Sequence, residues 1–346
     1  MSPSAALAGY SNLALYSAMA VYTLAMIMFA AHLAALGPVT ADRATRRRER
    51  ALVSAGGTSA SASASATAGV VGVVGAVDAV DDAVVVDDAG AEDAPTLRAR
   101  KVAGVGLSLS WLGTLLLGAS IVMRGLSVMR PPWGNMFEFA CVGAFAAALT
   151  YCVLARRNSW QWLGLFVIGP VLLTLGLALR GFYTDAAELM PALQSVWLVI
   201  HVTVATLAVG ILTIAFSVGI IYLLKAHREQ SPPAKRNFME TLPGAARLER
   251  TAYGLNVVGF ILWTFTLIAG AIWAQKAWGS YWTWDPKEVW TFVVWVVYAA
   301  YLHARATAGW EPRKAMTIAL AGYACILVNF LVVNVYFVGQ HSYSGL

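Results

Sequence analysis

The stretch WGSYWTWDPKEVW, residues 278–290, joins two apolar segments that are each long enough to cross a lipid bilayer. Residues 273–295 hold six of the thirteen tryptophans of the chain. One or two tryptophans at each membrane interface are ordinary anchors. Six in one connection, beside Asp285, Lys287 and Glu288, predict a flat aromatic platform with charged groups at its edge. Such a platform would suit a large planar ligand with a charged rim; a membrane-surface aromatic belt is the alternative.

The composition indicates that lipid, and not water, surrounds most of the chain. Apolar residues make up 59% of it, charged residues only 12%, and the mean hydropathy is +0.66. A soluble domain carries about 25% charged residues. We therefore expect an all-α integral membrane protein, a polytopic bundle of about eight transmembrane helices. The apolar runs lie at roughly 12–36, 102–126, 136–155, 160–179, 193–224, 252–276, 289–307 and 315–338.

The basic residues predict how the bundle is oriented. Alternate connections carry most of the lysines and arginines, within residues 43–50, 98–101, 156–157, 225–250 and 305–314. Because Lys and Arg concentrate in cytoplasmic loops, we expect these connections to be cytoplasmic and both termini and the Trp-rich loop to be external. The first apolar run lacks a small-residue cleavage site, so we do not expect it to be removed as a signal peptide. Scattered at helix ends, the basic residues predict no nucleic-acid partner.

The cysteines exclude several kinds of site. Cys141, Cys152 and Cys325 all lie within apolar runs, and none forms a CxxC pair. This pattern argues against a disulfide framework and against a structural zinc site. Because the chain has no CxxCH sequence, it does not attach heme covalently to itself.

We divide the chain into three parts. Residues 1–37 hold the first transmembrane helix, and residues 102–346 form the main membrane domain with the Trp-rich loop at 273–295. Between them, residues 38–101 combine an arginine cluster, a Ser/Ala repeat and an acidic run. Low complexity without a core-forming pattern predicts that 38–101 is a disordered cytoplasmic linker.

Two histidines lie on the same side as the Trp-rich loop. His201 is in the outer part of the fifth apolar run, and His341 follows the eighth. An ionisable side chain within a membrane segment costs a few kcal/mol and is usually turned inward. Two imidazoles beside an aromatic platform predict the two axial ligands of one heme iron. The alternatives are a core histidine bonded to a helix carbonyl at 201 and a solvated tail histidine at 341.

The other histidines lie elsewhere. His303 follows Val289 by fourteen residues, about 21 Å along a helix, and is too far away to join the external pair. It could hold a second heme in an intramembrane entry site, or it is an interfacial histidine beside Arg305. His32 has a comparable depth and could be an opposite ligand or a snorkelling interfacial residue. His227 lies in a charged run and is assigned no role.

Residues 278–290 resemble the WWD signature of the heme-handling protein superfamily, and within it the chain resembles the CcsA (ResC) family of System II cytochrome c biogenesis. Further matching stretches are Arg124 with 131–138, and residues 191–202, 298–305 and 339–343. The resemblance runs from about residue 120 to the end of the chain. The insertion at 38–101 departs from the compact members of the family.

This resemblance implies a heme-handling membrane domain with its WWD loop at 273–295. The basic connections predict that this loop is external, on the periplasmic side, and the high Ala, Val and Gly content favours a bacterial plasma membrane over a plastid one. Heme b would enter through an intramembrane site with His303 as one ligand and the other from the partner CcsB (ResB). It would then be held between His201 and His341 and attached to the CxxCH of apocytochrome c, so that the pair acts as a holocytochrome c synthase. A thiol-reducing, thioredoxin-like protein is a further candidate partner. The candidate heme-binding residues are His201, His341, His303, Trp278, Tyr281, Trp282, Trp284, Asp285, Trp290 and Arg124.

Several assignments stay open on the residues alone. Arg124, Arg130 or Lys287 could meet the heme propionates. Asp285 and Glu288 are expected to orient the loop or to pair with Lys287. The alternative functions are a System I-type heme lyase or heme carrier, a membrane b-type cytochrome in electron transfer, and a transporter of another planar substrate. Eight helices with a separate histidine on the seventh favour the System II family over System I. External ligands from a helix and a tail, together with the Trp-rich loop, argue against a b-type cytochrome.

Overall fold

The computed structural model describes residues 3–57, 94–158, 160–188, 193–230 and 238–341, and every regular element in these ranges is helical. Within these ranges, eight helices are long and apolar enough to cross a membrane, which confirms the predicted all-α polytopic fold. They cover Ala5–Leu36, Leu97–Ser127, Met136–Asn158, Gln161–Gly181, Val196–Gln230, Ala245–Trp278, Pro286–Ala306 and Pro312–Tyr336. The chain is therefore a multi-pass membrane protein.

The helices are consecutive along the chain and vary in length. They are α1 Pro3–Gly57, α2 Ala94–Ser127, α3 Met136–Asn158, α4 Gly164–Gly181, α5 Val196–Gln230, α6 Ala245–Trp278, α7 Pro286–Ala306 and α8 Pro312–Leu327. A π-helical segment, η4 Val328–Val333, and the short α9 Asn334–Tyr336 continue α8. Short 3₁₀ turns, η1 Gln161–Leu163 and η3 Phe238–Thr241, precede α4 and α6.

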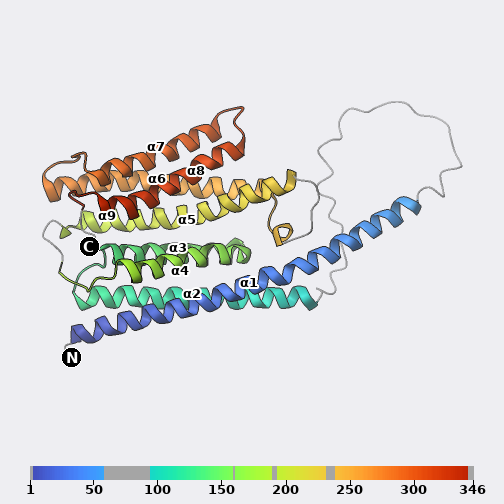
Figure 1. Cartoon of the computed structure of the whole chain (residues 1–346), viewed down its shortest axis with the longest axis horizontal. Helices are drawn as coiled ribbons and strands as arrows, with labels where there is room; N and C mark the ends of the chain where they lie inside the picture. Colours follow the sequence, from blue (N-terminus) through green and yellow to red (C-terminus); the bar gives the residue numbers. More distant parts are fainter. Residues whose placement is uncertain (1–2, 58–93, 159, 189–192, 231–237, 342–346) are drawn as a thin grey trace.

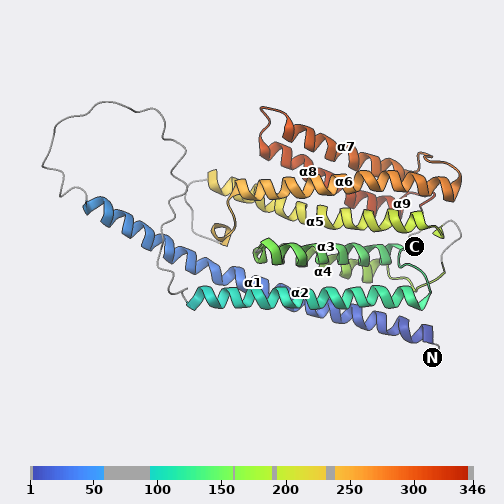
Figure 2. The ribbon, with the colours of Figure 1, turned by 180° about the vertical axis from the view of Figure 1, so that it is seen from behind.

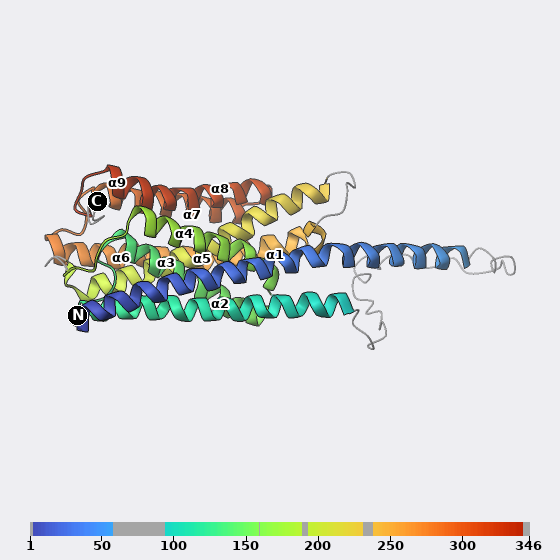
Figure 3. The same cartoon turned by 60° about the horizontal axis from the view of Figure 1, so that its bottom comes forward.

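The stretch between the first two helices is shorter than the predicted linker. Helix α1 continues to Gly57 and projects beyond the rest of the bundle, and α2 already begins at Ala94 (Figure 3). Residues 38–57 are rich in Ala and Arg, which are strong helix formers, so the helix continues past its apolar part. The remainder of the predicted linker, 58–93, lies outside the described residues.

The bundle is built from neighbouring antiparallel pairs. Helices α1 and α2 pack along one edge and α7 and α8 along the opposite edge, with α3 to α6 between them (Figures 1 and 2). Small residues allow close approach, as membrane helices require. At Gly210 of α5, an added Cβ would lie 2.8 Å from the backbone nitrogen of Ala147 on α3. Helices α3 and α5 therefore meet backbone to backbone at the centre of the bundle.

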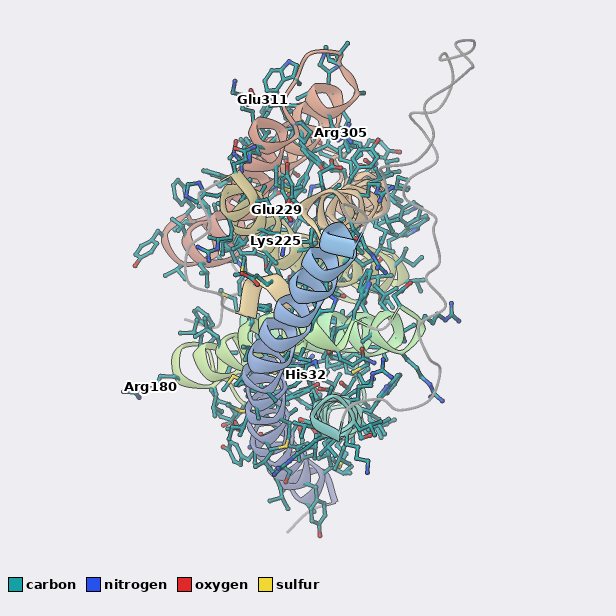
Figure 4. All side chains as sticks on the ribbon, turned by 90° about the vertical axis from the view of Figure 1, so that its right-hand side faces the viewer. His32, Arg180, Lys225, Glu229, Arg305 and Glu311 are labelled. Atoms are coloured by element: carbon teal, nitrogen blue, oxygen red, sulfur yellow. The ribbon has the colours of Figure 1, made fainter. Side chains whose placement is uncertain are left out.

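The two ends of the bundle differ in character. One end, here called the tryptophan-loop end, holds the connections 128–135 and 279–285 and the tail 337–341, with the start of α1 (Figure 1). The other, the basic end, carries the arginines and lysines of the alternate connections and is viewed in Figure 4, where Lys225, Glu229 and Arg305 are labelled. All the connections that bear the candidate external residues thus meet at one end.

Candidate functional site

A cavity of about 540 Å³ opens within the bundle at the tryptophan-loop end. Its wall is formed by residues of α3, α4, α5, α6, α7, α8 and η4, together with Tyr281, Trp282 and His341. Most of the lining is apolar, and its charged or ionisable members are His201, Lys287, Glu288, His341 and the phenols Tyr281 and Tyr323. A mostly apolar cavity of this size with a few placed polar groups is typical of a site for a small organic ligand or cofactor.

His201 projects from α5 against α6. Its Nδ1 atom lies 3.0 Å from the carbonyl oxygen of Thr266. Since a carbonyl can only accept, Nδ1 carries the hydrogen and donates it, and Nε2 keeps its lone pair. Gly270 makes room for the ring, because a Cβ at this position would lie 2.8 Å from Cε1 of His201. The ring is thus fixed in orientation and tautomer while its side chain lines the cavity.

His341 reaches the same cavity from the C-terminal tail. Its Nδ1 atom lies 2.8 Å from Oδ2 of Asp285. Backbone nitrogens of Gln340 and Lys287 donate to the two oxygens of this carboxylate, at 2.6 and 3.2 Å. A carboxylate at Nδ1 holds the hydrogen there and leaves the lone pair of Nε2 for a ligand. Both cavity histidines therefore present the same tautomer, although one is held by a backbone carbonyl and the other by a carboxylate.

Trp273, in the last turns of α6, connects the two histidines. Its ring stacks on His201 with centroids 5.9 Å apart, and it meets His341 edge to face at 5.5 Å. Trp278 packs edge to face on both Trp273, at 4.8 Å, and His341, at 5.0 Å. The side chain of Trp273 is only 2% exposed. These tryptophans form an aromatic support that brings His201 and His341 to neighbouring places in the cavity.

The loop between α6 and α7 owes its shape to its two helix ends. Helix α6 ends at Trp278 and is capped by Gly279, whose φ of +78° is a left-handed value that glycine adopts freely. Helix α7 begins with Asp285 as N-cap, Pro286 as its first residue, and a capping box completed by Glu288. Glu288 also accepts from the backbone nitrogen of Thr283 at 2.8 Å. Of the two expectations for Asp285 and Glu288, the geometry agrees with orienting the loop.

The remaining aromatic residues of the motif divide between the cavity and the surface. Tyr281 and Trp282 line the cavity. Trp284 does not; it is 75% exposed, has a φ of +62°, and meets Trp282 edge to face at 5.8 Å. A bulky residue with positive φ is strained, and such strain gathers at functional sites. Trp290 is half-buried on α7 and is not among the lining residues.

Arg124 lies at the same end but outside the cavity. Its Nε donates to Oε1 of Glu138 at 2.9 Å, and Arg130 donates to Oε2 of the same carboxylate at 2.8 Å. Arg124 also donates to the carbonyl of Thr184 and lies over the ring of Phe137. Both arginines thus neutralise one buried glutamate and tie together the connections after α2 and α4. Lys287 differs from them, since it lines the cavity.

His303 and His32 lie on different edges of the bundle. His303 is exposed in the last turn of α7. His32, on α1, is buried, and its Nδ1 lies 2.9 Å from the carbonyl oxygen of Ala99 on α2. Helices α1 and α7 are at opposite edges, and Figure 4 separates His32 from Arg305, two residues after His303. The geometry of one chain therefore does not support His32 as the opposite ligand to His303.

Sequence reasoning missed several residues that shape the site. Thr266 and Gly270 on α6 hold and accommodate His201, and Glu138 holds the two arginines. The signal for Gly270 was its spacing, three residues before Trp273 on one helix face. Glu138, a single carboxyl group at the start of an apolar run, was a visible signal for a buried ion pair.

Comparison with known proteins places this geometry in a family. A family model described as "Cytochrome C assembly protein" matches residues 133–341, which include every residue of the cavity wall. The chain is 32% identical over 269 residues to the cytochrome c biogenesis protein CcsA of Parasynechococcus marenigrum (strain WH8102), covering 70% of this chain and 87% of that one. It is 34% identical over 242 residues to the CcsA of Chlamydomonas reinhardtii, covering 67% and 66%.

The match and the structure lead to one assignment. The matched region begins just before α3 and ends at the cavity histidine of the tail. It also contains the loop between α6 and α7 that positions His341. The chain belongs to the CcsA family of System II cytochrome c assembly proteins, and is thus a heme-handling membrane protein of cytochrome c maturation.

Proposed function

We propose that the cavity receives heme b, holds its iron between Nε2 of His201 and Nε2 of His341, and presents it to the CxxCH sequence of apocytochrome c. One observation carries the proposal. Both histidines border the same cavity, and the Nδ1 of each is engaged by an acceptor. Neutral imidazoles with free Nε2 lone pairs are suitable axial ligands for heme iron.

The donor set fits heme in its chemistry. The surroundings of both histidines are aromatic and apolar, as Trp273 and Trp278 show, which suits a porphyrin face. Outer partners at Nδ1 fix the orientation of each ligand and raise its basicity. Thr266 supplies this partner to His201 and Asp285 supplies it to His341. The unlike partners make the two ligands unequal, so one of them can be displaced by the histidine of the apocytochrome more readily than the other.

The reaction that follows is an addition. Each cysteine thiol of CxxCH adds across a heme vinyl group, so that a carbon–sulfur bond forms and the thiol hydrogen goes to the other vinyl carbon. No electron leaves or enters, but the cysteines must be reduced. Fixing the vinyl groups and the thiols in close geometry is a principal contribution of a protein to such a step. Tyr281 and Trp284 are exposed in the loop between α6 and α7, where the apocytochrome would approach.

Delivery of heme to this cavity would begin at the basic end of the bundle. His303 is exposed on α7, at an edge of the bundle, so a ligand from another chain can reach the same iron. We assign this second ligand to the CcsB (ResB) partner, and the assembled pair would act as a holocytochrome c synthase. Residues 102–346 would be the heme-handling domain. The excess of Lys and Arg at the basic end favours a cytoplasmic position for that end. The WWD loop, at the opposite end, would then be on the periplasmic side of a bacterial plasma membrane.

A visible spectrum tests the proposal. The chain, co-expressed with a CcsB partner and purified in detergent, should show a reduced low-spin heme spectrum. The double variant His201→Ala/His341→Ala should retain much less heme and remain inserted in the membrane. A well-folded complex without any heme would contradict heme handling at this site. Full retention of heme by the double variant would instead contradict the two assigned ligands.

A further inference from the structure

Lys287 stands out among the charged groups of the cavity. It is the one lysine or arginine among the described residues that line it. Its Nζ atom donates to the carbonyl oxygen of Asn329 at 2.9 Å and to Oδ1 of Asn334 at 2.7 Å. Both acceptors are uncharged, and among the described residues Lys287 forms no ion pair. The cavity therefore contains a lysine whose Nζ atom has no carboxylate within ion-pair distance in the described part of the chain.

Arg124 and Arg130 make an informative contrast at the same end of the bundle. Their guanidinium groups share the buried carboxylate of Glu138, whose side chain is fully buried. A buried charge is normally paired, because leaving it unpaired costs several kcal/mol. The arginines follow this rule within the chain. Lys287 has no such ion pair among the described residues, and an anion bound in the cavity would supply one.

Helix stability does not explain the lysine. Lys287 is the second residue of α7, where the partial positive charge of the helix end disfavours a cation. Its side chain is instead directed across to η4 and α9, and the carbonyl that it contacts belongs to a π-helical segment. Such segments interrupt the regular α-helical ladder and occur frequently at functional sites. The cation is thus held at the cavity at some cost to the start of α7.

The wall beside Lys287 has a further unfilled polar position. Asn329 lines the cavity and donates through Nδ2 to Thr291 at 3.1 Å. Its Oδ1 is buried and has no hydrogen-bond partner. A buried acceptor without a partner is rare in native proteins and calls for a hydrogen-bond donor that is absent from the structure, such as a water molecule. Lys287 and the buried acceptor of Asn329 lie on the same part of the wall of this mostly apolar cavity.

We propose that Lys287 is the carboxylate-binding residue of this cavity, and that its Nζ binds a propionate of the heme. The inference rests on the proposed heme function and deepens it. An ammonium group and a carboxylate form a strong charge-assisted hydrogen bond in such surroundings. The two vinyl groups occupy the half of the ring away from the propionates. Anchoring a propionate at α7 therefore also selects which half of the ring is offered to the thiols.

Two porphyrins distinguish this role from heme binding in general. The full chain in detergent is titrated with iron(III) protoporphyrin IX and with its dimethyl ester, which has no free carboxylates. We expect the unsubstituted chain to bind the free acid about tenfold or more tightly than the ester. In Lys287→Met this preference should disappear while the affinity for the ester is unchanged. Lys287→Arg, which keeps the charge, should retain part of the preference.

The controls keep the outcomes separate. Lys276→Met removes an exposed lysine near the end of α6 and should leave the preference intact. Equal affinity of the unsubstituted chain for both porphyrins would overturn the proposal, and this result does not depend on whether any variant folds. A Lys287→Met chain that still prefers the free acid would overturn it as well. If neither porphyrin gives a low-spin spectrum with the unsubstituted chain, the proposed heme function fails as well. If both porphyrins give a low-spin spectrum with equal affinity, only the role of Lys287 fails.

Discussion

His341 and Asp285 form a hydrogen bond of 2.8 Å between Nδ1 and Oδ2, and Asp285 is at the same time the N-cap of α7. The two residues are 56 positions apart in the chain. The other carboxylate oxygen accepts from the backbone of Gln340, and a Cβ at Gly339 would run into it. One carboxylate therefore fixes the loop, the first turn of α7 and the tail that carries His341.

The first prediction separates the two roles of Asp285. Asparagine is also a good N-cap, so Asp285→Asn should preserve the start of α7 while it removes the negative partner of His341. We expect heme affinity to fall about 10- to 100-fold, the usual effect of losing such an outer partner. Asp285→Ala should add a loss of about 1 kcal/mol in stability, because the cap is also removed. Heme titration and thermal unfolding measure the two effects, and an Asp285→Asn chain with unchanged affinity would contradict the role.

The same carboxylate should make stability depend on pH. Burial acts to raise the pKa of Asp285, but hydrogen bonds from His341, Gln340 and Lys287 outweigh it and hold the pKa below its ordinary value of 3.8. Because the folded state has the lower pKa, this contribution is complete above about pH 3.8 and is lost as the pH falls towards the lowered value. Thermal unfolding midpoints measured through this range should fall less for Asp285→Asn than for the unsubstituted chain. Asp185→Asn, at an exposed residue of the same end, is the matched control.

The fold and much of the site could be predicted from the sequence, for identifiable physical reasons. Long apolar runs define membrane helices without reference to their neighbours, so the eight spans were predictable. Capping is also local, and the start of α7 is indicated by Asp285, Pro286 and Glu288. What could not be predicted depends on contacts between helices. The carbonyl of Thr266 meets His201 only because α5 packs on α6, and the choice among Arg124, Arg130 and Lys287 required knowing where Glu138 lies.

Gly270 offers a test of how His201 is positioned. An alanine there would place its Cβ 2.8 Å from Cε1 of His201, so the ring must turn and its bond to Thr266 weakens. We expect Gly270→Ala to lower the low-spin heme content and to cost about 1–3 kcal/mol of stability through overpacking. Gly254→Ala lies on the same helix with nothing within 4 Å of the added Cβ, and should lower neither quantity. Equal heme spectra for the two variants would remove this role from Gly270.

Glu138 should matter for stability more than for ligand binding. Replacing it by glutamine leaves the guanidinium groups of Arg124 and Arg130 without their buried anion. Breaking a buried pair by removing one partner costs about 3–5 kcal/mol. We expect the thermal unfolding midpoint of Glu138→Gln to fall markedly, while the folded fraction keeps the low-spin spectrum of the unsubstituted chain. A folded Glu138→Gln protein with an altered heme spectrum would instead connect these arginines directly to the ligand.

His303 tests the direction in which heme moves. The residue is exposed at the basic end of α7, whereas the cavity lies at the other end of the bundle, so His303→Ala should change stability by no more than about 0.5 kcal/mol. If heme enters past His303 and travels outward, the same variant, co-expressed with the CcsB partner, should carry less heme at His201 and His341. His227→Ala removes another exposed histidine of the basic end and should carry the normal amount. Full external heme in the His303→Ala complex would mean that heme reaches the cavity by another route.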